Sequence, residues 1–299
     1  MPNTLAHLGT QALPWKLLAP DTDIKWLAFG CIIPDLPWIA QRIVYHLIPT
    51  VDLIDLKIYC MIQASLLFCL LMSGAIALLV SASAPIFLIL AGNSLLHLIL
   101  DAAQTKWANG VHFLAPLNWQ LSQFHLFWPE HLIILILSLT GLATLLFFGI
   151  RDLSRPIRLA FSTLRLSVAA LLLALYLLLP LGLFEGPLQA DNHYVATLKN
   201  YQDRTGRKVG FDRCRYDSAG KQITIFTGEK FNAVGLLPER DGTISLIGRF
   251  TGARTVFIDK LHVHGPGRDL FSIVGVLLFG LFLVRATIIT SSAPRTSPE

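Results

Sequence analysis

The chain has 299 residues, of which 54% are hydrophobic and 14% are charged, and its mean hydropathy is +0.59. Soluble domains carry about 25% charged residues, so this composition excludes an ordinary soluble protein and predicts an integral membrane protein with one more polar section. The net charge of +5 is better explained by basic loops that orient the chain than by nucleic-acid binding. The four cysteines form no C-x-x-C pair, which argues against a thiolate zinc site.

The N-terminal segment, residues 1–22, has mixed polarity. Thr4 can cap a short helix that carries His7 on its first turns. Pro14 and Pro20 are expected to interrupt the helical pattern beyond those turns. The segment has no basic region followed by an apolar core, so a cleavable signal peptide is not indicated.

The first apolar stretch runs from Ile24 to Ile48 and is interrupted by Pro34, Asp35, Leu36 and Pro37. Two prolines three residues apart disfavour a regular helix. We expect a re-entrant pair of half-helices, because irregular backbone at membrane depth must be buried in protein or line a wet cavity. The alternative is a full membrane span, which would exclude His7 from a site shared with the later loops.

Five further apolar stretches are each close to the roughly 20 residues that a bilayer-spanning helix needs. They cover residues 57–81, 85–104, 131–150, 166–184 and about 270–290. Together with the re-entrant segment, they predict a membrane-embedded, all-α helical bundle of about five spans. The polar tail, residues 291–299, is expected to be disordered.

The most basic short loop lies between residues 150 and 166 and contains Arg151, Arg155, Arg158 and Arg165. Basic loops favour the cytoplasmic side, so we expect this loop to be cytoplasmic. Counting spans from it places the 105–130 loop and the later polar section outside, and the C-terminus inside. The expected location is the inner membrane of a bacterium, crossed several times.

The polar section from Gly186 to Asp269 is rich in β-forming residues and turn signals. About five or six short strands in roughly 80 residues predict a small barrel or sandwich, similar to an OB-type barrel. The expected strands cover residues 194–198, 208–211, 222–226, 243–246 and 254–258. The predicted domains are a membrane helical metal-site domain, an extracytoplasmic β-barrel and a C-terminal transmembrane helix, over residues 1–185, 186–268 and 269–290.

His97 and Asp101 are four residues apart, so a helix places them one turn apart on the same face. Ionisable residues inside an apolar span are costly and are functional-site candidates. His112 follows in a glycine-containing loop long enough to fold back, and two imidazoles with a carboxylate can bind a divalent metal. The alternative is a buried His–Asp hydrogen bond that ties two helices together.

Imidazole and carboxylate ligands suit Zn²⁺, Mn²⁺ or Fe²⁺ better than Ca²⁺ or Mg²⁺, and zinc is the first choice. Such an ion would lower the pKa of a bound water to about 7 and so provide a nucleophile. His125, Glu130 and His131 flank Trp128 and are expected at the membrane interface. His262 and His264 alternate along a strand and are expected on the surface.

The opening MPNTLAH, the run GCIIPD from Gly30 to Asp35, and the H-x-x-x-D of His97 and Asp101 carry a resemblance. They resemble the YdjM-type family of membrane-bound, predicted metal-dependent hydrolases, thought to be distant relatives of zinc-dependent phospholipase C. The resemblance covers roughly residues 1–130 and implies an all-helical core that binds metal.

The resemblance implies that His7, Asp35, His97 and Asp101 are metal ligands or orient them, with Asp35 and Asp101 as the catalytic pair. The run QRIVYH matches the family's H-R-G-x-T-H only at Arg42 and His46, which are weaker candidates. His112 is a metal-ligand candidate from its position alone.

The sequence therefore predicts a membrane-bound, metal-dependent hydrolase whose substrate is a phosphoester or lipid-like molecule. The alternative is a non-catalytic scaffold or sensor whose β-domain, residues 186–268, binds a protein partner. A transporter is less favoured because the two halves of the chain do not contain paired broken helices.

Overall fold

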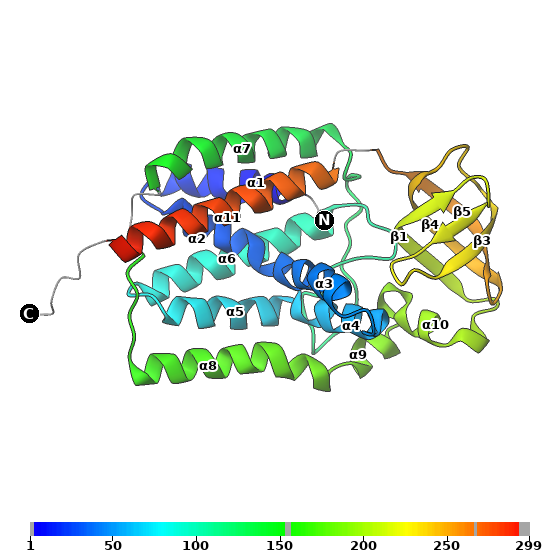
Figure 1. Cartoon of the computed structure of the whole chain (residues 1–299), viewed down its shortest axis with the longest axis horizontal. Helices are drawn as coiled ribbons and strands as arrows, with labels where there is room; N and C mark the ends of the chain where they lie inside the picture. The colour runs from blue at the N-terminus through cyan, green and yellow to red at the C-terminus, as the bar shows by residue number, and fades with distance from the viewer. Residues whose placement is uncertain (1–2, 153–156, 266–267, 293–299) are drawn as a thin grey trace, which may run out of the picture.

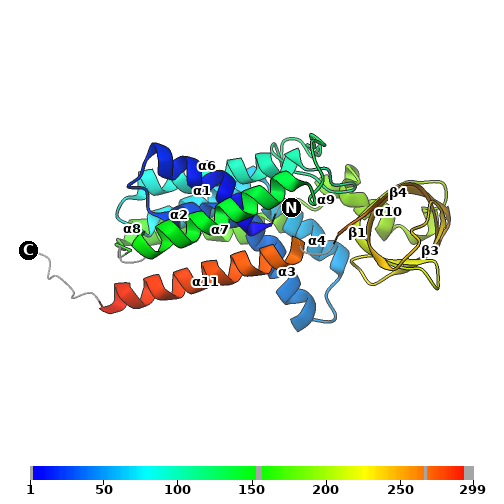
Figure 2. The same cartoon turned by 90° about the horizontal axis from the view of Figure 1, so that it is seen from above.

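The computed structural model describes residues 3–152, 157–265 and 268–292. A bundle of helices carries a small β-barrel at one end (Figures 1 and 2). The predicted combination of a helical bundle and a small all-β unit is therefore confirmed.

The bundle consists of the long helices of the first two thirds of the chain and the last helix. Their bounds are α1 (Thr4–Leu18), α2 (Ile24–Ile32), η1 (Ile33–Asp35), α3 (Leu36–Leu47), α4 (Leu53–Gln63), α5 (Leu66–Leu78), α6 (Ser83–Ala103), α7 (Leu132–Asp152), α8 (Thr163–Leu178) and α11 (Arg268–Ser292). Short helical turns connect α8 to the barrel: η2 (Leu179–Gly182), α9 (Glu185–Gln189), η3 (Asn192–Tyr194), α10 (Val195–Lys199) and η4 (Tyr201–Asp203).

Among the described residues, four helical segments are long and apolar enough to cross a membrane: Ile24–Leu47, Ser83–Ala103, Leu132–Gly149 and Thr163–Gln189. Only 17% of the most apolar window in the last of these is buried inside the protein, so its side chains form an apolar outer surface. Such a surface suits contact with lipid. The predicted helices at 85–104, 131–150 and 166–184 are confirmed.

The predicted span over 57–81 is not one straight helix, because α4 and α5 meet at an angle of 68°; together they are long and apolar enough for a broken span or a re-entrant loop. Ser65 has the extended backbone of a helix N-cap, without a capping hydrogen bond from its hydroxyl among the described residues, and α5 starts there in a new direction. The expected C-terminal helix is confirmed as α11, and within its described side chains the apolar stretch Leu270–Leu281 is shorter than a membrane span.

The predicted re-entrant fold at Pro34 and Pro37 is also wrong. The chain continues from α2 through the single 3-10 turn η1 into α3, and Ile24–Leu47 forms one candidate span. Each proline lies in the first turn of its element, where a missing backbone N–H breaks no helical hydrogen bond. The two prolines therefore change the helix type locally without reversing the chain.

The alternative expected a continuous span, and Ile24–Leu47 is one candidate span, but its exclusion of His7 from the site is wrong. α1 starts at the end of the bundle nearer the barrel and runs away from it, and α2 returns (Figure 1). The cap of α1 is Asn3, whose side chain accepts from the Ala6 N–H at 2.9 Å, and not Thr4. Pro14 lies inside α1 on its exposed side and does not end the helix.

Glycines allow close helix crossings around α1 and α2. A Cβ on Gly9 would lie 2.1 Å from a carbonyl oxygen of α7, and one on Gly141 would lie 1.8 Å from a carbonyl oxygen of α1. A Cβ on Gly30 would lie 2.8 Å from a side-chain carbon of α6, and one on Gly275 of α11 would lie 2.8 Å from Thr4 Cβ. Small residues at such crossings bring helix backbones together and fix the helices that carry the site.

The barrel contains β1 (Lys208–Asp217), β2 (Gln222–Thr224), β3 (Lys230–Gly235), β4 (Gly242–Gly252) and β5 (Thr255–Val263). It closes in the order β1-β2-β3-β5-β4, and the β3–β5 pair is parallel whereas the other pairs are antiparallel. Phe211, Phe231 and Phe250 pack in its core. Closure leaves no free sheet edge to pair with other chains.

Four of the expected strands fall on β1, β2, β4 and β5, but the strand expected at 194–198 is wrong. That segment forms η3 and α10, because His193 and Tyr194 adopt left-handed backbone angles and the Asp191 carboxylate accepts from Thr197 N–H at 3.0 Å. The sequence analysis missed β3, the strand that pairs in parallel with β5.

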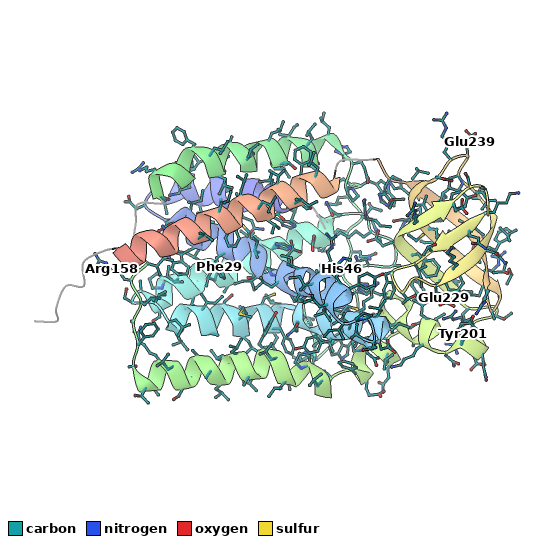
Figure 3. The ribbon with its side chains drawn as sticks, in the orientation of Figure 1. Phe29, His46, Arg158, Tyr201, Glu229 and Glu239 are labelled. Carbon is teal, nitrogen blue, oxygen red and sulfur yellow. The ribbon has the colours of Figure 1, made fainter. Side chains whose placement is uncertain are left out.

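The basic loop and the barrel lie at opposite ends of the bundle, with Arg158 at one end and Glu229 and Glu239 at the other (Figure 3). This is the arrangement that the span count requires, although the orientation in a membrane stays a prediction. Arg155 and residues 293–299, which include most of the tail expected to be disordered, lie outside the described residues.

Candidate metal centre

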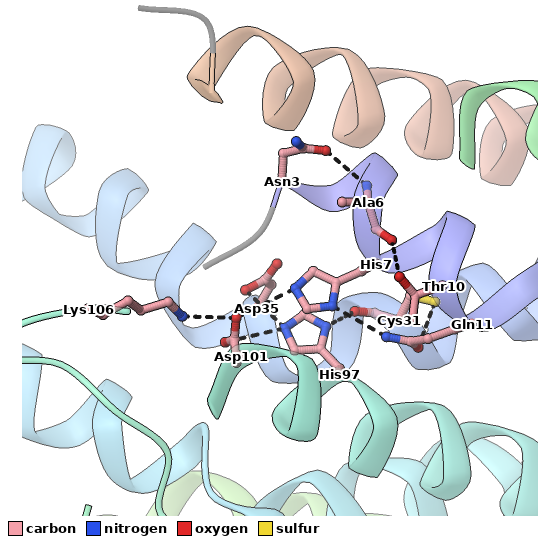
Figure 4. Close-up of polar contacts among 10 residues, drawn as sticks. All are labelled: Asn3, Ala6, His7, Thr10, Gln11, Cys31, Asp35, His97, Asp101 and Lys106. Carbon is pink, nitrogen blue, oxygen red and sulfur yellow. Dashed lines mark hydrogen bonds and ion pairs between the residues drawn. The ribbon is translucent and has the colours of Figure 1, made fainter. Parts of the chain in front are cut away.

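Four of the predicted site residues, His7, Asp35, His97 and Asp101, come together in the bundle (Figure 4), and we call them the bundle group. The rings of His7 and His97 stack with centroids 3.5 Å apart. His7 Nε2 lies 3.6 Å from Asp101 Oδ1, and His97 Nε2 lies 3.6 Å from Asp35 Oδ1 and 3.7 Å from Asp101 Oδ2. Two α-helices, α1 and α6, and the η1 turn therefore contribute to one point.

The outer ring nitrogens have partners that orient both imidazoles. His97 Nδ1 lies 2.6 Å from the Cys31 carbonyl oxygen, which can only accept, so Nδ1 donates and Nε2 keeps its lone pair. His7 Nδ1 lies 3.4 Å from the side-chain amide of Gln11, one turn further along α1. Such outer partners are the usual way in which proteins fix the tautomer of a metal-binding histidine.

The inward-facing atoms His7 Nε2, His97 Nε2 and Asp35 Oδ1 have no hydrogen-bond partner among the described residues. Both imidazoles are fully buried, and Asp101 is 6% exposed. An unpartnered buried polar atom costs about 1–3 kcal/mol, so several of them directed at one point indicate a ligand site. Imidazole nitrogens and carboxylate oxygens fit a divalent transition metal ion.

The sequence analysis missed one charged member of the site, Lys106. Its Nζ donates to Asp101 Oδ1 at 3.0 Å, and the lysine is only 4% exposed. The sequence signal was its position, five residues after Asp101 and just beyond the end of α6. Lys106 balances a carboxylate that would otherwise be buried without a cation.

His112 is not brought into the bundle group. It is 3% exposed, and its ring centroid lies 6.3 Å from that of His193 and 5.8 Å from that of Trp119. His193 comes from η3, far from every motif that the sequence analysis used, so no sequence signal pointed to it.

Arg42 and His46 lie on the exposed side of α3, where Figure 3 labels His46. They are not part of the bundle group, and neither are His125 and His131, which are exposed on the 104–131 segment.

A cavity of about 380 Å³ lies between the bundle group, His112 and the barrel. Asp101 and His112 line it, Arg42 and His46 line it from α3, and Asp212 of β1 lines it from the barrel. One carboxylate of the bundle group is therefore in contact with a space that is large enough for a small ligand.

A second set of metal-ligating residue types, Glu130, His262 and His264, lies where the 104–131 segment meets the barrel, and we call it the junction group. His264 Nδ1 lies 2.6 Å from Glu130 Oε1, and His262 Nε2 lies 3.4 Å from Glu130 Oε2. His264 Nε2 lies 2.7 Å from Ser245 Oγ, and Trp128 stacks on His262 at 3.5 Å. The prediction that His264 is a surface residue is wrong, because it is 8% exposed.

The electrostatics of the junction group are those of a structural contact. Burial opposes ionisation of Glu130, but its hydrogen bonds to His264 and His262 and the charge of His264 outweigh burial and lower the pKa of Glu130 to about 2. Burial lowers the pKa of His262, and its hydrogen bond to Glu130 offsets only part of that shift. The group joins the barrel to the bundle through bonds among its own members.

No protein-family model, curated protein or solved structure matches this chain. The function is therefore inferred from the chemistry of the side chains.

Proposed function

We propose that this protein is a membrane-bound, metal-dependent hydrolase that cleaves a phosphoester of a lipid-like substrate. The observation that carries the proposal is the convergence of unpartnered, buried ligand atoms from His7, His97 and Asp35 on the Asp101 carboxylate. A buried hydrogen-bonded pair, the alternative considered for His97 and Asp101, would leave no such unpartnered atoms.

His7, His97 and Asp101 would hold the ion, because their ligand atoms all lie within 4.8 Å of one another. Zinc is the first choice for this ligand set, with manganese or iron as alternatives. When bound, the ion would supply Lewis acidity and lower the pKa of a water to about 7.

The two carboxylates have different surroundings and therefore different proposed roles. Asp101 has Lys106 as a counter-ion and lies 3.6–3.7 Å from the Nε2 atoms of both imidazoles, as expected of a fellow metal ligand. Asp35 Oδ1 is unpartnered, and the Asp35 side chain is 14% exposed, twice the 7% of Asp101. Asp35 is thus the better placed to accept a proton from an attacking water.

The walls of the cavity support an amphiphilic substrate. Trp38, Met61 and Leu98 line it together with cationic side chains. The cavity lies where α3, α4 and α6 meet the barrel and combines apolar with charged walls, so a lipid-like molecule could bind with its polar end toward Asp101. This supports location in a membrane and a lipid bilayer as the immediate partner.

Two finer assignments belong to the same proposal. The five-stranded closed barrel, with its one parallel strand pair, supports an OB-like identity for the β-domain. The grouping of His7, Asp35, His97 and Asp101 supports the proposed relation to YdjM-type hydrolases, in which these positions are the expected ligands.

The test uses the full chain in detergent, stripped of metal with a chelator and then given zinc or manganese. We expect hydrolysis of bis(4-nitrophenyl) phosphate and of phospholipid vesicles only after metal is restored. Asp35→Asn should lower the rate by about 100-fold or more, the usual contribution of a general base.

The matched control is Asp55→Asn, which removes an exposed carboxylate on α4 that pairs with Lys199 at 2.6 Å, and it should leave the rate unchanged. A purified wild-type protein that binds no transition metal would overturn the proposal and favour the alternative, a scaffold whose β-domain binds a partner.

A further inference from the structure

His112 and His193 face the cavity next to the bundle group and are not used by the proposed reaction. They are 3% and 4% exposed, and both line the cavity. Within the part of the chain that the structure describes, neither ring nitrogen of either histidine has a hydrogen-bond partner. The Trp119 backbone lies close enough to the His112 ring to raise its pKa, but both His193 nitrogens and one of His112 remain without a partner, and a ligand in the cavity would satisfy them.

The backbone that holds His193 is strained. Asp191, His193 and Tyr194 have φ values of 48°, 54° and 58°, in the left-handed region that residues with a side chain rarely adopt. The contacts around them maintain this geometry: the Asn192 side chain donates to the Trp119 carbonyl at 2.7 Å. Strain of this kind concentrates at functional positions, and here it places an imidazole at the cavity wall.

The charges around the pair favour an anion. Lys57 lines the same cavity, and its Nζ lies 3.9 Å from the centroid of the Phe226 ring. Among the described residues, no hydrogen bond or ion pair involves this ammonium group. Asp101 pairs with Lys106, whereas Asp212 accepts only from neutral donors and attracts Lys57. The cavity still has a positive balance, because Arg42, Lys57 and Lys106 line it against these two carboxylates.

We propose that His112, His193 and Lys57 form a subsite for a phosphate-type anion beside the bundle group. The ammonium supplies the positive charge, and each neutral imidazole supplies an N–H donor. The assignment of this anion to the substrate depends on the proposed function, but the subsite itself does not.

A cation is the alternative ligand, and two observations argue against it. The nearby Lys57 would repel a metal ion, and the described residues provide no third histidine, cysteine or carboxylate that converges with His112 and His193. Burial lowers the pKa of His112 to about 4, and burial together with Lys57 lowers the pKa of His193 well below its usual value. Both rings are therefore neutral at pH 7 and available as donors.

The test measures binding of inorganic phosphate to the metal-stripped full chain by isothermal titration calorimetry. We expect His193→Asn and His112→Asn each to weaken phosphate binding about tenfold, as loss of one hydrogen bond in a buried site predicts. Asparagine tolerates the left-handed backbone at His193, so this variant should fold.

The matched control is His125→Asn. It makes the same change at an exposed histidine with a nearly identical φ of 51°, and phosphate affinity should stay within twofold of wild type. Equal unfolding temperatures of the variants separate loss of binding from loss of folding.

A second arm identifies the source of the anion by comparing inorganic phosphate with dihexanoyl phosphatidic acid. Tighter binding of the lipid, reduced by Trp38→Ala, assigns the subsite to a headgroup; equal binding assigns it to free phosphate; both outcomes support an anion subsite. Wild-type protein that binds neither probe, or a His193→Asn variant that binds them as tightly as wild type, overturns the inference. Binding by the metal-stripped protein with no hydrolysis after zinc or manganese is restored would contradict only the proposed function.

Discussion

The bundle group and the junction group both combine histidines with carboxylates, but they differ in whether these side chains bond one another. In the junction group, Glu130 bonds both His262 and His264, so its ligand atoms satisfy one another. In the bundle group, the Nε2 atoms of His7 and His97 approach carboxylate oxygens only to 3.6–3.7 Å and have no hydrogen-bond partner among the described residues.

This difference separates a structural contact from a candidate binding site. Donors and acceptors that are free to adjust settle at hydrogen-bond distance, as His264 and Glu130 do at 2.6 Å. The bundle group keeps a wider spacing around a common point, because each imidazole is oriented by a partner behind it. Residue composition alone does not distinguish the two groups.

The largest expected effect comes from removing the counter-ion of Asp101. Lys106→Met leaves this buried carboxylate without its ammonium partner, which should lower the stability of the metal-free protein by about 3–5 kcal/mol. Zinc should restore most of the loss, since an ion at the bundle group would compensate Asp101. Thermal unfolding with and without zinc measures both values.

The control for this variant is Lys199→Met, which breaks an exposed ion pair with Asp55 and should cost at most about 1 kcal/mol. If zinc does not rescue Lys106→Met, Asp101 is not a ligand.

Removing one histidine from each group tests the comparison directly. His97→Ala should weaken zinc binding about 100-fold, since a ligand matters at least as much as the outer partners, whose loss costs about 10–100-fold. His262→Ala should leave zinc affinity within twofold of wild type. Titration with a competing chelator gives both affinities, and equal losses in the two variants would contradict the distinction between the groups.

Acid should weaken the junction group specifically. The folded-state pKa of Glu130 is lowered from 4.5 to about 2, so its contribution to stability is present above about pH 4.5 and disappears as the pH falls toward 2. Because this carboxylate is partly exposed, we expect Glu130→Gln to cost only about 1 kcal/mol at pH 7. The difference in unfolding free energy between Glu130→Gln and wild type should vanish near pH 2, as measured by tryptophan fluorescence during unfolding. A difference that stays constant from pH 7 to pH 2 would show that ionisation of Glu130 does not stabilise the fold.

The smallest effects should come from the exposed residues of α3. Arg42→Ala and His46→Ala remove side chains that lie outside both groups, so stability should change by less than about 0.5 kcal/mol. Zinc content, measured by plasma emission spectrometry, should equal that of wild type. A loss of bound zinc in His46→Ala would show that α3 moves inward to complete the site.

Much of the bundle group could be predicted from the sequence because its signals are local. His97 and Asp101 are one helical turn apart, and Asp35 lies between two prolines that interrupt an apolar stretch. All three residues could therefore be found from spacing and composition. The junction group requires Glu130 to meet a strand more than 130 residues later, and His193 depends on a strained turn. Contacts of that kind depend on tertiary packing and leave no periodic pattern.

The path of the N-terminal segment could not be predicted for a different reason. Proline rules correctly identified Pro34 and Pro37 as unusual but did not say whether the chain would turn back or continue. The path of α1 depends on close backbone contacts such as the one at Gly9, which set how deeply α1 enters the bundle. Helix propensity contains no information about that depth.

The contact between Gly275 and Thr4 has a consequence for biogenesis. The ribosome produces α1 well before α11, yet α11 packs directly against the start of α1. α1 has only 15 residues, too few to cross a bilayer of about 30 Å as a helix rising about 1.5 Å per residue. α1 must therefore be sheltered until α11 emerges, and a chain stalled before α11 would present His7 on an incompletely covered helix.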